Sequence, residues 1–219
     1  MRYNWLMYDL ILFDLDGTLV NSQRGIEFCL RHVFDRHGVT FTGDITKFIG
    51  PPFVRSFPQF LGTDERKTEL MISDYRDLYA TTGVYQTTLF RGITDLLSSL
   101  KNSGKAVALA TTKPRHFAEV ILKHKHIYKY FDFVSGTEPD GSLTDKVDVL
   151  NNAFSHLPFS HEQSVLIGDT IYDALGAKEV GLDCIGVTYG YGTKDELISC
   201  GVKQIATSPR EVKKILLGQ

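Results

Sequence analysis

The sequence has few cysteines, no long apolar run and no excess of either charge. Only 3 of its 219 residues are cysteine, and they lie far apart, so we expect neither a disulfide framework nor a thiolate metal site. A reducing, cytoplasmic setting fits this usage best. Met1 to Phe13 contains Asn4 and Asp9 and has no basic leader, which is unlike a signal peptide.

Two further absences limit the partners. No apolar run approaches the length that spans a membrane, so we expect no membrane partner. The 24 basic and 26 acidic residues give a net charge of -2, which leaves no basic field to attract nucleic acid. The sequence leaves the oligomeric state open.

Short apolar runs bounded by Gly, Asp or Thr alternate with amphipathic stretches along the chain. This pattern predicts an α/β fold, in which helices wrap a mostly parallel sheet. Most of the runs are continuously apolar, as expected for strands that are covered on both faces. The predicted strands are Leu10 to Phe13, Ala106 to Ala110, Phe131 to Val134, Val165 to Ile167, Cys184 to Val187 and, more weakly, Gln204 to Ala206.

About ninety residues separate the first two predicted strands, far more than one crossover helix needs, so an inserted domain is expected there. Ser22 is a candidate N-cap for its first helix. A second long helix is predicted from Thr63 to Thr81, with Gly50-Pro51-Pro52 as the turn between the two. In that helix Tyr75 and Tyr79 are expected to form core rather than a substrate platform. We assign residues 1–20 and 91–219 to the main domain and 21–90 to the helical insertion.

Polar residues follow the predicted strands, where ligands of an open parallel sheet collect. Four carboxylates in one crevice would repel one another unless a divalent cation neutralised them. Oxygen ligands without His or Cys favour Mg²⁺ over zinc. The residues at these positions are Asp14 and Asp16, Thr111 and Thr112, Asp169 and Asp173, and Lys146 at the start of the helix before the fourth strand.

These residue types suit phosphoryl transfer. A carboxylate such as Asp14 can attack phosphorus and form an aspartyl-phosphate, while Asp16 can give a proton to the leaving alcohol and later activate water. Lys146 and the Thr111 hydroxyl can donate to the remaining phosphate oxygens. Gly17 permits the sharp turn that follows the first strand.

Four segments together resemble the signature motifs of the haloacid dehalogenase-like superfamily, in the same order and context. The resemblance covers essentially the whole chain. It implies a Rossmann-like parallel sheet core with an α-helical cap inserted between the first two motifs. The matching segments are Asp14-Leu15-Asp16-Gly17-Thr18, Thr111, Lys146 and Gly168-Asp169 to Asp173.

The resemblance also implies roles. Asp14 would be the nucleophile and Asp16 the general acid and base. Asp14, the backbone carbonyl of Asp16 and Asp169 would hold Mg²⁺, with Asp173 in support through water or by holding Lys146. The phosphoryl group would be bound by Thr111, Lys146 and the backbone N–H of Thr112.

Ile49-Gly50-Pro51-Pro52 and Thr111-Thr112-Lys113-Pro114 resemble the phosphoglycolate phosphatase-like branch, close to which nucleoside monophosphate and pyrophosphate phosphatases also lie. Arg91 departs from this branch, where proline often precedes the glycine. We therefore expect hydrolysis of a small-molecule phosphomonoester: phosphoglycolate, a nucleotide or a sugar phosphate. A cap arginine, Arg24 or Arg55, could pair with a substrate carboxylate.

Two other functions compete with this expectation. A sugar-phosphate mutase would use the same intermediate, but valine often stands at the position of Thr18 in mutases. A phospho-receiver signalling module also combines acidic residues, magnesium, Thr and Lys on a parallel sheet. In a receiver, however, the phosphoacceptor usually follows the third strand, and no helical insertion is needed.

Overall fold

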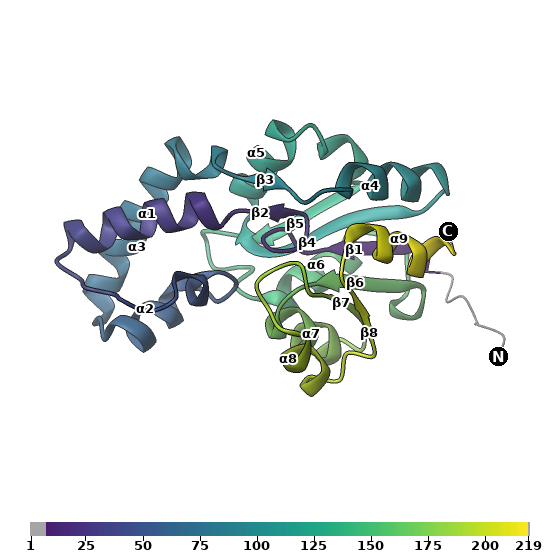
Figure 1. The fold of residues 1–219 in the computed structure, drawn as a ribbon. Coiled ribbons are helices and arrows are strands. Elements are labelled where there is room, and N and C mark those ends of the chain that lie inside the picture. The colour runs from purple at the N-terminus through teal and green to yellow at the C-terminus, as the bar shows by residue number, and fades with distance from the viewer. Residues whose placement is uncertain (1–7, 219) are drawn as a thin grey trace.

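The computed structural model describes residues 8–218, so residues 1–7 of the segment judged unlike a signal peptide lie outside the described residues. Six parallel strands form one sheet in the order β5-β4-β1-β6-β7-β8, which confirms the predicted α/β class (Figure 1). Their bounds are β1 Leu10–Phe13, β4 Ala106–Pro114, β5 Phe133–Thr137, β6 Ser164–Gly168, β7 Asp183–Val187 and β8 Gln204–Ala206.

Helices cover both faces of this sheet (Figure 1). Side chains alternate along a strand, so Ile11 and Phe13 of β1 join one buried cluster while Leu10 and Leu12 join another. The continuous apolar runs are thus explained by burial on both sides. One face carries α4 (Ile93–Asn102), α5 (Arg115–His124) and α9 (Pro209–Leu217), and the other carries α6 (Lys146–His156), α7 (Ile171–Glu179) and α8 (Lys194–Ser199).

β6 extends its predicted strand by one residue at each end and β7 by one residue at its start, and two other strands need larger corrections. β4 continues beyond Ala110 to Pro114, and β5 runs from Phe133 to Thr137 instead of starting at Phe131. The two strands pair across a register shift, with Pro114 opposite Thr137. The end of β4 is polar although Thr111 and Lys113 are buried, so no apolar pattern marked it in the sequence.

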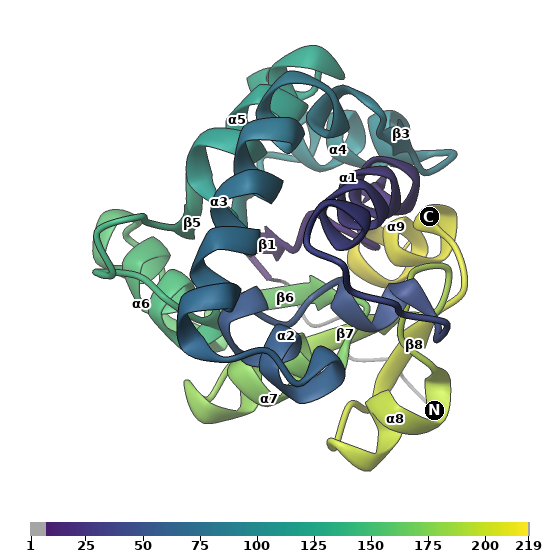
Figure 2. The same ribbon diagram turned by 90° about the vertical axis from the view of Figure 1, so that its left-hand side faces the viewer.

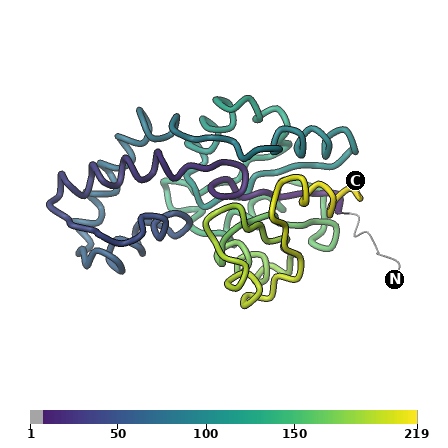
Figure 3. The backbone as a smooth tube through the Cα atoms, viewed as in Figure 1, coloured from purple at the N-terminus to yellow at the C-terminus, as the bar shows by residue number. Residues whose placement is uncertain are grey.

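Three helices form the insertion between β1 and β4: α1 (Gln23–Arg36), α2 (Phe53–Leu61) and α3 (Glu65–Thr81). Figure 2 shows them standing in front of the sheet's end. The chain enters and leaves them through β2 (Val20–Asn21) and β3 (Thr88–Leu89), which pair antiparallel (Figure 3). Both connections to the insertion therefore lie side by side.

The insertion has its own aromatic core. The Phe34 and Phe57 rings each pack edge-to-face on Phe48, with centroids 5.6 and 5.7 Å apart.

In residues 8–218 no helix combines the length and apolarity needed to cross a membrane. Short 3-10 helices complete the chain at Ile45–Phe48, Gly83–Tyr85, Tyr128–Tyr130 and His161–Gln163.

The structure adds two details to the expectations about the insertion. The Gly50-Pro51-Pro52 turn leads into α2, which the sequence analysis missed because it is only 9 residues long and contains Pro58. Ser22 is the N-cap residue of α1, yet within the described residues its side chain makes no capping hydrogen bond. The hydroxyl of Tyr191 instead accepts from the backbone N–H groups of Ser22 (2.9 Å) and Gln23 (3.1 Å).

Candidate active site

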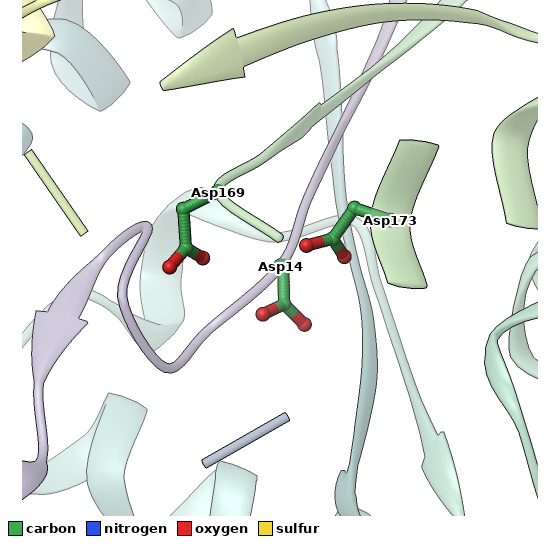
Figure 4. A group of neighbouring side chains, drawn as sticks. All are labelled: Asp14, Asp169 and Asp173. Carbon is green, nitrogen blue, oxygen red and sulfur yellow. The ribbon is translucent and has the colours of Figure 1, made fainter. Parts of the chain in front are cut away.

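Three aspartates meet at the carboxyl edge of the sheet (Figure 4). Asp14 follows β1, Asp169 follows β6, and Asp173 lies in the first turn of α7. β1 and β6 are parallel neighbours, so the residues that follow them leave the sheet together. One carboxylate oxygen of each aspartate lies within 4.8 Å of the other two.

Lys146 is the buried cation of this cluster. Its Nζ donates to Asp14 Oδ1 at 2.8 Å and to the Ala110 carbonyl at 2.8 Å, and lies 2.7 Å from Asp173 Oδ1. Burial lowers the pKa of Lys146, but the charges of the two carboxylates outweigh it, so the pKa lies above its usual value. One lysine against three carboxylates leaves a net negative charge.

Burial is the main influence on the pKa values of Asp14 and Asp169. It raises the pKa of Asp14 to about 6, with Lys146 opposing the rise and Asp173 adding to it. It also raises the pKa of Asp169, helped by the charges of Asp173 and Asp14. Such a cluster fits a divalent cation, because the cation would offset the buried negative charge. The donor set consists of carboxylates, which fits Mg²⁺.

The loop after β1 is closely packed on Asp169. Gly17 has φ of +84°, and a Cβ there would overlap the Asp169 carboxylate, so both conformation and space require glycine. The Thr18 hydroxyl donates to Asp169 Oδ1 at 3.0 Å, and the Tyr191 N–H donates to Oδ2 at 2.8 Å. Sequence reasoning gave neither Thr18 nor Tyr191 a part in this cluster.

Asp16 points to a different neighbour. Its Oδ2 accepts from Lys113 Nζ at 2.8 Å, and among the described residues its inaccessible Oδ1 has no hydrogen-bond partner. Lys113 Nζ also lies 4.7 Å from the centroid of the Tyr79 ring. The sequence analysis gave Lys113 no role, although it follows Thr111 by two residues on one strand, a spacing that can place both side chains on the same face.

The two threonines of β4 have different surroundings. Thr111 is buried, and its Oγ1 accepts from the Lys113 N–H at 3.3 Å. The Thr112 hydroxyl donates to the Gly50 carbonyl at 3.2 Å, which joins the core to the helical insertion. The phosphate-binding role of these threonines stays a prediction. The contact between Thr112 and the insertion was not predicted from the sequence.

A cavity of about 340 Å³ separates the insertion from the core, and Asp16, Thr112 and Lys113 line it. Tyr75 and Tyr79 are buried core residues, as expected, but they also form part of the cavity wall. The two arginines proposed to contact the substrate, Arg24 and Arg55, are not among the described residues that line the cavity. Arg24 lies in a hollow beside α1, and Arg55 is exposed on α2. The described arginine that lines the cavity is Arg76.

Comparison with known proteins places the chain in a family. A sequence model described as haloacid dehalogenase-like hydrolase matches residues 11–187, well over half of the chain. The chain therefore belongs to the haloacid dehalogenase-like hydrolases, as its four motifs predicted. It is a phosphatase-type enzyme of this family that acts on phosphate esters.

Three relatives illustrate the range of this family. A 5'-nucleotidase of Pseudomonas aeruginosa is 37% identical over 200 residues, which are 90% of each chain. The tyrosine-protein kinase PtkA of Mycobacterium tuberculosis is 38% identical over 188 residues, which are 85% of this chain and 64% of that protein. The crystal structure of a predicted phosphatase from Clostridium acetobutylicum superimposes with a TM-score of 0.92 at 36% identity, covering 97% of this chain and 100% of the other.

Proposed function

We propose that the protein is a magnesium-dependent phosphatase of small-molecule phosphomonoesters that works through an aspartyl-phosphate on Asp14. The observation that carries this proposal is the buried cluster of Asp14, Asp169 and Asp173 beside an Asp16 that faces the cavity. Phosphoglycolate, nucleotides and sugar phosphates remain the candidate substrates, and the nucleotidase from Pseudomonas aeruginosa supports the second of these.

The metal would be held by Asp14, the backbone carbonyl of Asp16 and Asp169. When bound, Mg²⁺ supplies positive charge that stabilises the phosphoryl oxygens. Asp173 has a supporting role in this proposal, because it lies 2.7 Å from Lys146 Nζ and accepts from the Thr170 N–H and hydroxyl. These contacts hold Lys146 beside Asp14.

The protein's own groups would then carry two displacements. In the first, an Asp14 oxygen forms a bond to phosphorus, the ester P–O bond breaks, and Asp16 gives its proton to the leaving alcohol. In the second, Asp16 takes a proton from water, whose oxygen attacks phosphorus and frees Asp14. Lys146, the Thr111 hydroxyl and the Thr112 N–H would hold the phosphoryl oxygens.

The proposal also assigns separate functions to the main domain and to the helical insertion. Residues 1–20 and 91–219 would form the catalytic core, and residues 21–90 the cap that selects the substrate. The hydrogen bond from Thr112 to Gly50 supports a cap that closes on the core and excludes water.

A cytoplasmic location is also proposed, supported by the three free cysteines.

The test is phosphate release from a generic aryl phosphate, with magnesium or with a chelator. The wild type should turn over many times only with magnesium, and Asp14→Asn should be inactive. Asp35→Asn makes the same chemical change on an exposed part of α1 and should retain full activity. Full activity in Asp14→Asn would remove this residue from the nucleophile role.

The same preparation distinguishes the competing functions. Isomerisation of a hexose 1-phosphate without phosphate release would establish a mutase. A stable phosphoprotein without turnover would establish a receiver module. Because one relative is named a tyrosine-protein kinase, phosphate transfer from ATP to a tyrosine peptide belongs in the panel, and its appearance in place of hydrolysis would overturn the proposal.

A further inference from the structure

The wall of the cap-core cavity is mixed, with several aromatic rings among aliphatic and polar residues. The cap contributes Phe53, Tyr75 and Tyr79, and α5 of the core contributes Phe117. Phe53 meets the edge of Tyr75 with centroids 4.6 Å apart, and Tyr79 meets the edge of Phe117 at 5.2 Å. At about 340 Å³ the space is at the lower end of the range of about 300 to 1,000 Å³ that holds drug-sized ligands.

Several polar groups in this wall already have protein partners. Thr137 donates its hydroxyl to the Thr112 carbonyl, Glu138 pairs with Arg115, and Thr144 donates to Asp148. A ligand with many hydroxyl groups, such as a hexose phosphate, would lose its water here and find few groups to replace it. Each unsatisfied buried group is costly, so the cavity disfavours such a ligand.

A small acid is also a poor match. A two-carbon ester such as phosphoglycolate would leave much of the cavity unfilled. Of the two cations in the wall, Lys113 is held 2.8 Å from Asp16 and Arg76 is exposed on α3. A flat apolar group instead matches the rings and the aliphatic residues of the wall.

We propose that this cavity holds the base of a nucleoside monophosphate while the phosphate lies at Asp14, and that Phe53 is a specificity-determining residue. The inference rests on the proposed phosphatase function. A nucleoside monophosphate has the required parts in the required order: a phosphate ester, a short polar sugar and a flat aromatic base. Base stacking on aromatic side chains then supplies binding that a base-free ester lacks.

The test compares AMP with ribose 5-phosphate, which differs from it only by the base. With magnesium, kcat/KM for AMP is expected to exceed that for ribose 5-phosphate by roughly 10- to 100-fold, the size of one stacked base. A ratio near one, or a preference for ribose 5-phosphate or phosphoglycolate, overturns the inference and leaves the phosphatase proposal intact. No phosphate release from any ester refutes the phosphatase proposal itself.

Two matched variants assign the effect to the cavity. Phe53→Leu removes an aromatic wall and is expected to lower the AMP to ribose 5-phosphate ratio by at least fivefold, while turnover of ribose 5-phosphate itself shows that the protein is folded. Phe154→Leu makes the same change on α6, at a ring that packs on His161 away from the described cavity wall, and should leave the ratio unchanged. Equal ratios in both variants would refute the role of Phe53.

Discussion

Replacing Asp14 by Asn should abolish activity and yet stabilise the metal-free protein. Burial is the largest reason why the pKa of Asp14 rises from 3.8 to about 6. Between about pH 4 and pH 6 the folded state therefore binds more protons than the unfolded chain, and stability falls as the pH rises through this window. Above it, the ionised carboxylate costs the fold about 3 kcal/mol, because the shift of about 2 pKa units corresponds to about 1.4 kcal/mol for each unit.

Asn carries no charge at any pH, so at pH 7 in a chelator Asp14→Asn should recover about 1 to 3 kcal/mol of this cost. The attraction of Lys146 Nζ, 2.8 Å away, is already contained in the pKa of Asp14, so it is not subtracted again. For a chain of 219 residues this corresponds to a rise in Tm of about 3 to 10 °C. Near pH 4 the gain should vanish, because Asp14 is then largely protonated in the folded protein.

Thermal denaturation of both proteins, with chelator and with magnesium, measures these effects. Magnesium should raise the Tm of the wild type, since it binds the folded state, and should have much less effect on Asp14→Asn. Asp35→Asn controls for the loss of one negative charge at an exposed site. A Tm of Asp14→Asn below that of the wild type in chelator at pH 7 would refute the reasoning, because the carboxylate would then be a stabilising group.

Three further substitutions test contacts around the site. Gly17 has a φ of +84° and lies against a carboxylate, so Gly17→Ala should lower the free energy of unfolding by more than about 1 kcal/mol and remove most of the magnesium-dependent activity. The control is Gly38→Ala, at a φ of +63° with no described atom near its Cβ, which should keep full activity. Thermal melts and phosphate-release assays measure both variants. Thr112→Val removes the hydroxyl bonded to the cap and should lower kcat/KM about fivefold, while Thr112→Ser retains it; equal kinetics would contradict the cap contact. Lys113→Met leaves the Asp16 carboxylate without its cation and should cost about 3 kcal/mol in urea unfolding, most of it restored by adding Asp16→Asn. Strictly additive losses in that double variant would show that the two groups are not coupled.

Local patterns were sufficient for the α/β class and the six strands of the main sheet. A strand buried on both faces is expected to be apolar along its length, and β1 shows this directly. The carboxyl ends of parallel strands share one edge, so residues as distant as Asp14 and Asp169 could be placed together from the sequence. The α2 helix was missed because a short segment with an internal proline has little helical signal.

The sequence by itself determined the fold class and the meeting of Asp14 with Asp169 at one end of the sheet, because each follows a predicted strand of a parallel sheet. Only the tertiary structure decided which residues of the cap and of β4 contact the site. The pairing of Lys113 with Asp16, the contact of Thr112 with Gly50 and the position of Tyr79 in a cavity wall all depend on how the cap is oriented on the core. That orientation follows from packing between segments far apart in the chain, which no local pattern records.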